Sequence, residues 1–420
     1  MTRIKKNGLL LLCNVFAVIF YFSIIHALGG MEYVRQTVFS TGDSKEYLGY
    51  SEWISGASEY CDPFRTFMYP LLILLPYKLC GVPGIWMMQF IFWIVSCNLV
   101  FISAARVCGN VRWGAAAFLL LASSISLISL TAHALTEITV LFFLSVFVSI
   151  LARHHTDLRS PAVTLRVIFL LAVLAVVKPV FSIPFFLSCL LFLLIHFKHI
   201  LRRPVLFLLL PVCSLPYLAQ VAINKTKHDT FSTSQIADYN LRNYFFLKTE
   251  YRNAHGSLDG FDTQADSIRV QQMDSVKAIS KAGIISFLLR HPVQSFAVFW
   301  DDERDNLGSG HPYIKREQHE SLYKWTENIN DKYFYVHILF FVLWLYLIFS
   351  KRGRKSASHL FLLASGLLLY YLFATLGITF WAGDRLGAPV CALWAVVYVG
   401  ILKELLVTRR EHSTRRVIRT

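Results

Sequence analysis

Two carboxylates stand in the first polar stretch of the chain, residues 39–53, which reads FSTGDSKEYLGYSEW. Asp43 and Glu46 follow closely on an apolar run that is long enough to cross a membrane. A carboxylate at the membrane–water boundary suits general-base chemistry, because it can take the proton from an acceptor hydroxyl. The same spacing also fits a local capping pair, with Asp43 as the N-cap of a helix and Glu46 three residues later. The sequence leaves both roles open.

A few charged residues interrupt the apolar segments further along the chain. Glu137 lies in TAHALTEITV, Lys178 in VVKPVFSIP, and Asp384 and Arg385 lie in FWAGDRLGAP. Ionisable groups at membrane depth are costly, so they usually face a cavity or mark a site. The alternative is that a Lys or Arg at a helix end simply reaches the headgroups. Lys178 and Arg385 are suited to a phosphate group, and a phosphate at this depth belongs most naturally to a lipid.

The segments that must position these residues are apolar helices. The chain has 420 residues, of which 55% are hydrophobic and 16% are charged, so an ordinary soluble domain is excluded. Apolar runs of membrane-spanning length recur from end to end. They predict an all-α multi-pass membrane protein with about ten transmembrane helices, at residues 8–29, 84–105, 113–132, 135–152, 162–177, 180–197, 204–222, 334–350, 358–379 and 388–407.

Charge predicts the orientation of these spans. Lys and Arg collect in TRIKK, in the links RHHTDLRS, FKHILRR and KRGRK, and in the tail from Lys403, whereas loop 30–68 is acidic. Because basic residues gather on the cytoplasmic side, both termini are expected in the cytoplasm and the large polar segments outside. The formal net charge of +15 then reflects topology, and nucleic acid is not expected as a partner. The first apolar run is too long for a signal peptide and is expected to be a retained helix.

The chain is expected to divide into three parts. Residues 1–222 form an N-terminal transmembrane module of about seven spans, with an outer catalytic loop at 30–83. Residues 223–333 form an extracytoplasmic cap, and residues 334–420 form a C-terminal module of three spans with a basic cytoplasmic tail. The segment 69–80 is too short to span and is expected to be an interfacial or partly inserted helix on the outer side.

Two further predictions concern the structure of residues 223–333. The run DSIRVQQMDSVKAISKAGIISFLLRHPVQSFAVFW predicts a helix, a break at Pro292 and a second amphipathic helix. The run DDERDNLGSGHPY that follows is rich in turn formers, and His311 within it is expected in a solvated loop. DDERD imitates an acidic metal-binding motif, but it lies far along the chain from Asp43. We therefore expect no cofactor and do not favour a required divalent metal.

Five segments in this order resemble the GT-C superfamily of membrane glycosyltransferases: GDSKEYLGYSEWI, RTFMYPLLILLPYKLCG, LTAHALTEITVLFFL, VVKPVFSIPFFL and WAGDRLGAPVCALWAV. The chain is most similar to the branch of protein O-mannosyltransferases and lipid A aminoarabinose transferases, over roughly residues 8–197 and 380–407. The resemblance implies a GT-C-like helical bundle that moves a sugar from a polyprenyl phosphate to an acceptor hydroxyl with inversion. The chain departs from the lipid A branch because the longer soluble C-terminal domain of that branch has no counterpart here.

The resemblance also implies roles for individual residues. Asp43 matches the general base for the acceptor. The donor phosphate would be held by basic residues that fall on Arg65, Lys178 and Arg385. Glu137 matches an acidic position of the third outer turn. Substrate contacts or supporting roles are expected of Glu137, His133, Tyr47 and Glu46.

The implied partners are an undecaprenyl-phosphate-like sugar donor, a glycan or lipid-linked saccharide acceptor, and membrane lipids. This chemistry fits modification of a bacterial surface glycan, such as the O-antigen of lipopolysaccharide, at the periplasmic face of the inner membrane. Two other functions remain open, a flippase or transporter of lipid-linked sugars and an O-antigen ligase or polymerase. A transporter is expected to show two halves of repeated topology, which the sequence does not show, whereas a ligase or polymerase differs only in its products.

Overall fold

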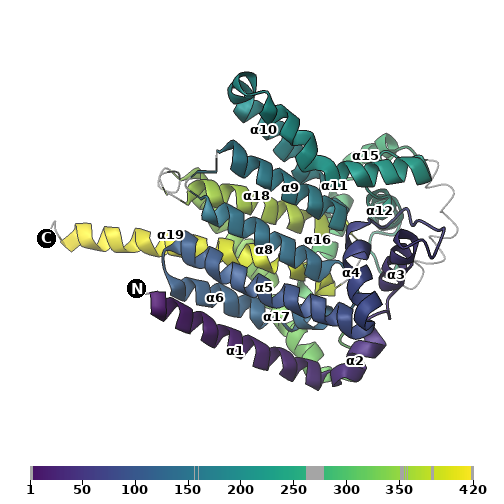
Figure 1. Cartoon of the computed structure of the whole chain (residues 1–420), viewed down its shortest axis with the longest axis horizontal. Coiled ribbons are helices and arrows are strands. Elements are labelled where there is room, and N and C mark those ends of the chain that lie inside the picture. Colours follow the sequence, from purple (N-terminus) through teal and green to yellow (C-terminus); the bar gives the residue numbers. More distant parts are fainter. Residues whose placement is uncertain are drawn as a thin grey trace. The chain divides into compact units, whose positions relative to one another are not determined.

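Helices account for all of the regular structure in the described part of the chain (Figure 1). A computed structural model describes residues 3–417, except 156, 159, 262–278, 351–353, 355, 357 and 380–382. The chain divides into two compact units. Unit 1 comprises Met1–Thr233, Tyr335–Tyr370 and Ala388–Thr420, and unit 2 comprises Ser234–Phe334 and Tyr371–Gly387.

Unit 1 is a bundle of long apolar helices with shorter helices at one end. The long helices and their neighbours are α1 (Arg3–Ala27), α5 (Val82–Cys108), α6 (Val111–Ala122), α7 (Ile125–Leu130), α8 (Glu137–Arg153), α9 (Pro161–Val177), α10 (Ser182–Arg202), α11 (Val205–His228) and α19 (Cys391–Val417). The shorter elements are α2 (Gly30–Thr37), α3 (Gly42–Ile54), α4 (Met68–Cys80), η1 (Pro179–Phe181) and η5 (Ala388–Val390). Two helices contribute residues to both units: α17 (Glu320–Phe349) and α18 (His359–Leu376).

Seven helices within the described residues are long and apolar enough to cross a membrane. They are α1, α5, α10 with η1, α11, α17, α18 and the stretch Gly383–Leu406 that ends in α19. Each of the seven coincides with one of the ten predicted spans, so a multi-pass membrane protein is confirmed. The other three predicted spans fall on α6 with α7, on α8 and on α9, each of which has 17 residues or fewer. The count of ten therefore stays a prediction.

The predicted span 113–132 is interrupted by two serines. Ser123 ends α6, and the extended backbone of Ser124 turns its hydroxyl back to accept a hydrogen bond from the N–H of Leu127. Serine competes with the helical backbone for hydrogen bonds, which favours it at a cap over the middle of a helix. The chain therefore stops and restarts within a segment that is apolar throughout. The segment 69–80 does form the expected short helix, α4.

Paired polar groups hold the spans of unit 1 together. Asn14 on α1 and Asn98 on α5 exchange two side-chain hydrogen bonds, each 2.9 Å long. The hydroxyl of Tyr21 on α1 accepts a hydrogen bond of 2.8 Å from the indole N–H of Trp86 and lies 2.6 Å from the hydroxyl of Thr131. Amide and hydroxyl groups within an apolar bundle need such partners, because no water is present to satisfy them.

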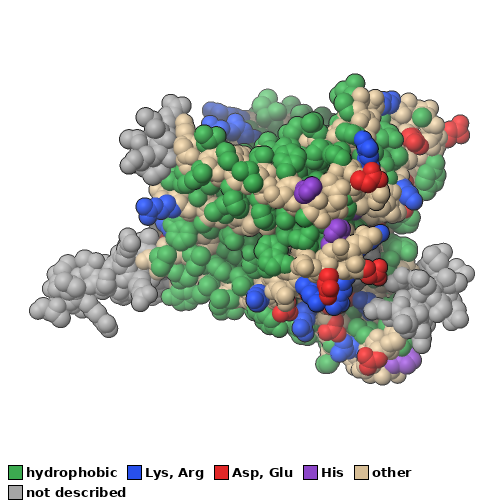
Figure 2. Space-filling model, turned by 90° about the horizontal axis from the view of Figure 1, so that it is seen from below, with side chains coloured by type: hydrophobic (Ala, Val, Ile, Leu, Met, Phe, Trp, Pro, Cys, Tyr) green, Lys and Arg blue, Asp and Glu red, His purple; other side chains and the backbone are tan. Residues whose placement is uncertain are grey.

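The outer faces of several spans remain apolar and exposed. Helices α10 and α11 leave Leu190, Leu194, Leu208 and Leu215 more than half exposed. Hydrophobic side chains also cover much of the lower side of Figure 1, which Figure 2 shows from below. A contiguous apolar surface of this kind suits contact with lipid. Within unit 1, Figure 1 places the N- and C-termini at one end and α2, α3 and α4 at the opposite end.

Unit 2 is built from α12 (Ile236–Asn240), η2 (Leu241–Phe246), α13 (Leu247–His255), α15 (Lys281–Arg290), α16 (Pro292–Gly308) and η4 (Gly383–Arg385), with the adjoining parts of α17 and α18. The predicted break at Pro292 is confirmed, because α15 and α16 meet there at 99°. The first part of the predicted helix, up to residue 278, lies outside the described residues.

The prediction that DDERDNLGSGHPY is turn-rich is wrong for its first eight residues. These residues continue α16 to Gly308. The reason is that α13 supplies counterions for the start of the run: Arg252 donates to Asp301 at 2.6 Å and Lys248 donates to Asp302 at 2.5 Å. Because these ion pairs neutralise Asp301 and Asp302, the acidic residues are tolerated within α16.

A test of the packing in unit 1 uses Gly114, which lies where α6 crosses α5. A Cβ at this position would lie 2.7 Å from the backbone oxygen of Phe101 and 3.0 Å from the Cβ of Ala105. We expect Gly114→Ala to lower the free energy of unfolding by about 1–3 kcal/mol through overpacking, measured as a lower Tm in detergent. The matched control is Gly8→Ala, because a Cβ at Gly8 in α1 meets nothing within 4 Å. Equal Tm values for the two variants would contradict this packing.

Candidate functional site

The N-cap of α3 determines whether the Asp43 side chain is needed to start this helix. Thr41 is the N-cap: its hydroxyl accepts a hydrogen bond of 3.1 Å from the N–H of Ser44, and its own N–H donates to the Ser44 hydroxyl at 3.2 Å. The capping box is therefore Thr41 with Ser44, and the prediction of Asp43 as N-cap with Glu46 as its partner is wrong. The extended backbone of Thr41, with φ −92° and ψ 155°, is the N-cap geometry. Asp43 instead lies inside the first turn.

Asp43 and Glu46 both bind the guanidinium group of Arg65. The distance from Arg65 Nη2 is 2.5 Å to Asp43 Oδ1 and 2.5 Å to Glu46 Oε2, and Arg65 Nε donates to Glu46 Oε2 at 2.6 Å. The Arg65 side chain is 13% exposed and that of Asp43 is 29% exposed. Charge-assisted hydrogen bonds of this length are strong, but the Glu46 side chain is 45% exposed, so water screens its contact more than that of Asp43. The two carboxylates, one turn apart on α3, therefore share one cation.

The loop that carries Arg65 is held in place at both ends. The carboxylate of Asp62 accepts a hydrogen bond of 2.7 Å from the N–H of Phe64, and the amide oxygen of Gln220 on α11 accepts one of 2.8 Å from the N–H of Phe67. Gln220 is itself buried and donates to Asn224 at 2.9 Å. Arg65 is thus positioned by a fixed backbone, which lowers the entropy lost when it binds an anion.

Tyr47 connects this ion pair to a second acidic residue. The guanidinium carbon of Arg65 lies 5.0 Å from the centroid of the Tyr47 ring, which is within the range of a cation–π contact. The buried Tyr47 hydroxyl forms a hydrogen bond with Thr136 and lies within the fields of Arg65, Asp43 and Glu137. Burial raises the pKa of Tyr47 above its usual value, with further contributions from the two carboxylates. The phenol therefore stays neutral and can donate.

The same neighbours act on the pKa of Arg65. Burial lowers the pKa of the guanidinium, but the negative charges of Asp43 and Glu46 outweigh burial and raise the pKa above the usual value for arginine. Arg65 is therefore a permanent cation in this cluster.

Glu137 and Lys178 form the second ion pair of unit 1. Glu137 is the first residue of α8 and is 1% exposed, and Lys178 Nζ lies 3.7 Å from its Oε1. Lys178 is the residue at which α9 ends: its N–H closes the last turn on the carbonyl of Leu174, and Pro179 follows. Proline lacks the N–H that would continue the helix, so the break places Lys178 at the end of the bundle. A buried carboxylate requires such a partner.

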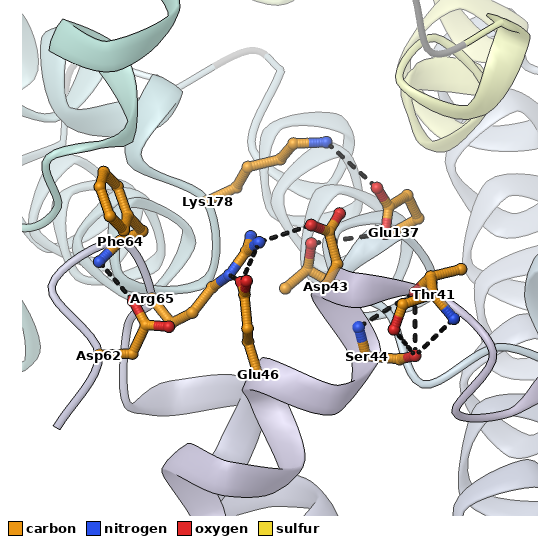
Figure 3. Close-up of polar contacts among 10 residues, drawn as sticks. Thr41, Asp43, Ser44, Glu46, Asp62, Phe64, Arg65, Glu137 and Lys178 are labelled. Atoms are coloured by element: carbon orange, nitrogen blue, oxygen red, sulfur yellow. Dashed lines mark hydrogen bonds and ion pairs between the residues drawn. The ribbon is translucent and has the colours of Figure 1, made fainter. Parts of the chain in front are cut away.

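Figure 3 shows the side chains of Asp43, Arg65, Glu137 and Lys178 turned toward one region at this end of unit 1. We call Asp43, Glu46, Tyr47, Arg65, Glu137 and Lys178 the acid–base cluster. It combines two cations, which can hold an anion, with carboxylates, which can accept a proton.

Two residues of this region were not singled out in the sequence. Tyr69 on α4 packs edge-on against Tyr47, with 5.0 Å between ring centroids, and its electrostatic neighbours are Tyr47 and Glu137. Thr136, whose hydroxyl lies 3.5 Å from Glu137 Oε2, precedes α8. The signal for Tyr69 was its place in the segment RTFMYPLL, four residues after Arg65.

His133 lies in the turn before α8 and contacts Tyr33 and Gln89. Its ring packs edge-on against Tyr33 of α2, with 6.2 Å between centroids, and its Nε2 lies 3.5 Å from the Tyr33 hydroxyl. Its backbone carbonyl accepts a hydrogen bond of 2.7 Å from Gln89. These contacts fix the turn between α7 and α8, which positions Glu137 indirectly.

Asp384 and Arg385 belong to unit 2 and have partners within it. His311 Nδ1 lies 2.6 Å from Asp384 Oδ1, and Asn330 donates to Asp384 Oδ2 at 2.7 Å. The guanidinium carbon of Arg385 lies 5.6 Å from the ring centroid of Tyr313. His311 is 0% exposed, so the expectation of a solvated loop around it is wrong. The loop closes over the histidine because the Asp384 carboxylate satisfies its ring nitrogen. A phosphate shared by Arg385 and Lys178 stays a prediction.

Comparisons of this chain with protein-family models, with curated proteins and with solved structures give no match. The function of the chain is therefore inferred from the residues of the acid–base cluster and their geometry.

The cap of α3 offers a test that separates helix stability from chemistry at Asp43. We expect Thr41→Val to lower the free energy of unfolding by about 1 kcal/mol, because the capping hydroxyl is lost. Asp43→Asn should cost less, because Arg65 keeps Glu46 and only a charge near the helix N-terminus is removed. Thermal unfolding in detergent measures both. A larger drop in Tm for Asp43→Asn than for Thr41→Val would indicate that Asp43 contributes more to the start of the helix than Thr41 does.

Proposed function

We propose that this protein is an inverting glycosyltransferase of the GT-C type. It moves a sugar from a polyprenyl-phosphate donor to an acceptor hydroxyl at the membrane surface. The observation that carries the proposal is the acid–base cluster, in which Asp43 with Arg65 and Glu137 with Lys178 lie at the same end of an apolar bundle. A site of this kind suits a donor whose phosphate lies at the membrane surface while its chain stays in the lipid.

Asp43 is proposed as the general base. The acceptor hydroxyl is a weak nucleophile at neutral pH, and a carboxylate that takes its proton accelerates the attack by about 10²–10⁴-fold. A carboxylate has lone pairs on two oxygens, so accepting from Arg65 through Oδ1 leaves acceptor capacity on the group. The cap of Thr41 supports this role, because the side chain of Asp43 is not used to start its helix.

Arg65 and Lys178 are proposed to hold the phosphate of the donor. The acceptor oxygen forms a bond to the anomeric carbon while the bond from that carbon to the phosphate oxygen breaks. The leaving lipid phosphate keeps the electron pair, and the acceptor proton passes to Asp43. Fixed cations stabilise the charge that grows on the leaving group. Attack opposite to the leaving oxygen inverts the anomeric centre.

Glu46, Tyr47 and Glu137 are proposed as supporting residues. Glu46 shares Arg65 with Asp43, Tyr47 offers a hydroxyl beside both pairs, and Glu137 holds Lys178 at the helix end. Arg385 is proposed as a further phosphate ligand, on the resemblance of WAGDRLGAP to the GT-C pattern. Each of these groups supports binding more directly than it supports proton transfer.

The donor and acceptor follow from the same resemblance. We propose an undecaprenyl-phosphate-like sugar donor and a surface glycan acceptor such as the O-antigen of lipopolysaccharide, with both termini in the bacterial cytoplasm and the site on the periplasmic face. The termini of unit 1 lie together at the end opposite to α3 and α4 (Figure 1), which supports this orientation. The basic links near the termini also support it.

The first test of the proposal is transfer by the purified protein. The protein is placed in liposomes with a panel of polyprenyl-phosphate sugars and acceptor glycans, and released polyprenyl phosphate is measured. We expect Asp43→Asn to lower kcat/KM at least about 100-fold. Glu52→Gln is the matched control, because Glu52 is an exposed carboxylate on the same helix, and it should retain the parent rate. A full rate in Asp43→Asn would favour a transporter, which does not need this base.

The second test separates phosphate binding from proton transfer. We expect Lys178→Gln and Arg65→Lys to raise the KM for the donor about 10-fold or more, because a charge-assisted hydrogen bond to the phosphate is lost. The acceptor KM should change less. Lys78→Gln, at the exposed end of α4, is the control for charge. An unchanged donor KM in both site variants would show that these two residues do not bind the donor phosphate.

A further inference from the structure

Loop 309–314 of unit 2 packs closely against η4, the turn that carries Arg385. Gly383, the first residue of η4, has φ +58°, a conformation that favours glycine. A Cβ at Gly383 would lie 2.8 Å from the backbone oxygen of Gly310 and 2.9 Å from Cδ of Pro312. Because no side chain fits between them, the loop and the backbone of the turn are in direct contact.

Asp384, the middle residue of η4, is bound through both of its carboxylate oxygens. His311 Nδ1 lies 2.6 Å from Oδ1, and Asn330 of α17 donates to Oδ2 at 2.7 Å. A carboxylate only accepts, so the imidazole carries a proton on Nδ1 and donates it to Asp384. The side chains of His311 and Asp384 are 0% and 7% exposed, so water does not compete for this bond. The orientation of the turn is thereby fixed.

Helix α17 anchors the loop that carries His311. The amide nitrogen of Asn330 that binds Asp384 also donates to the carbonyl of Ser309 at 2.9 Å, so one side chain joins the loop to the turn. The N–H of His311 donates to the hydroxyl of Thr326 at 3.4 Å. His311 is therefore held both at its backbone and at its ring.

Tyr313 connects His311 to Arg385. The rings of His311 and Tyr313 meet edge-on at 84°, with 5.6 Å between their centroids. The guanidinium carbon of Arg385 lies 5.6 Å from the centroid of the Tyr313 ring, within the range of a cation–π contact. Arg385 is partly exposed, whereas His311 and Asp384 are buried. The buried residues thus form a frame behind a cation that a ligand can reach.

We propose that His311 is a positioning residue for Arg385, which it prepares through Asp384 and Tyr313 to bind the phosphate of a lipid. An arginine that is fixed before its ligand arrives loses less side-chain entropy on binding, and its planar guanidinium group suits a phosphate. His311 does not touch the phosphate, because its side chain is fully buried. This role rests on the proposed function of Arg385 as a phosphate ligand, but it does not depend on sugar transfer.

Binding of a polyprenyl phosphate that carries no sugar tests this role. The full chain is placed in phosphatidylcholine nanodiscs, and polyprenol of the same length, which lacks the phosphate, is the control for the lipid chain. We expect the parent protein to bind the polyprenyl phosphate at least about 10-fold more tightly than the polyprenol. Arg385→Gln should remove most of this difference, because the charge that binds the phosphate is lost.

Variants of His311 separate its hydrogen bond from its packing. His311→Phe keeps a ring beside Tyr313 but loses the donor to Asp384, and it should weaken binding about 10-fold. His311→Asn places a side-chain N–H on the same γ-carbon, so it should bind within about 3-fold of the parent. His255→Phe is the matched control, because His255 is exposed and stacks on Tyr251 within α13, and it should bind as the parent does.

A double variant shows whether His311 acts through Arg385. Once Arg385 is replaced, no guanidinium group is left to position, so His311→Phe combined with Arg385→Gln should bind no more weakly than Arg385→Gln alone. Tyr313→Leu keeps the test open if His311→Phe lowers the Tm too far. It removes the ring beside the guanidinium group and should weaken binding about 3-fold or more.

Several results would overturn the positioning role. They are a parent protein that does not prefer the phosphate to the polyprenol, an unchanged Kd in Arg385→Gln or in both His311→Phe and Tyr313→Leu, equal losses in His311→Asn and His311→Phe, and additive losses in the double variant. The expected pattern of binding in a chain that transfers no sugar would contradict the transferase proposal alone. Sugar transfer by a chain whose His311 variants bind as the parent does would contradict the positioning role alone.

Discussion

The acid–base cluster depends on Arg65 being held between two carboxylates at the edge of an apolar bundle. Asp43 and Glu46 lie three residues apart on α3, so their side chains are on one face of the helix and repel one another. Arg65 removes this repulsion and joins the loop before α4 to α3. Removing Arg65 would leave the two carboxylates facing each other without a cation, whereas removing one carboxylate leaves Arg65 paired with the other. The geometry of the site therefore follows from this one cation.

The second ion pair adds what the first lacks. Arg65 Nη2 lies 2.5 Å from Asp43 Oδ1, whereas Lys178 Nζ lies 3.7 Å from Glu137 Oε1, so the second contact is the longer one. An ammonium group carries three N–H donors, so Lys178 can keep Glu137 as a partner while it also contacts a phosphate. Tyr47 contacts Arg65 of the first pair and lies within the field of Glu137 of the second. One pair is suited to fixing the site and the other to binding an anion.

Much of the helical framework could be predicted from the sequence, and the departures have local physical reasons. The seven long apolar helices were predicted because length and hydrophobicity are properties of a single segment. The bend at Pro292 was predicted because proline lacks an amide hydrogen. The break within 113–132 was missed because Ser124 can either continue a helix or cap a new one. The extension of α16 was missed because its acidic residues are neutralised by α13, which is distant in sequence.

By itself, the sequence determined that this chain is helical, crosses a membrane, and places charged residues at the ends of apolar helices. These are properties of composition and of neighbouring residues, which act over a few turns of helix. Only the tertiary structure decided how the charges pair. Thr41 rather than Asp43 caps α3, and Arg65 and Lys178 bind Asp43 and Glu137, which lie on other parts of the chain. Such pairs form only when folding brings separate segments within hydrogen-bonding distance, and no local sequence pattern predicts which segments will meet.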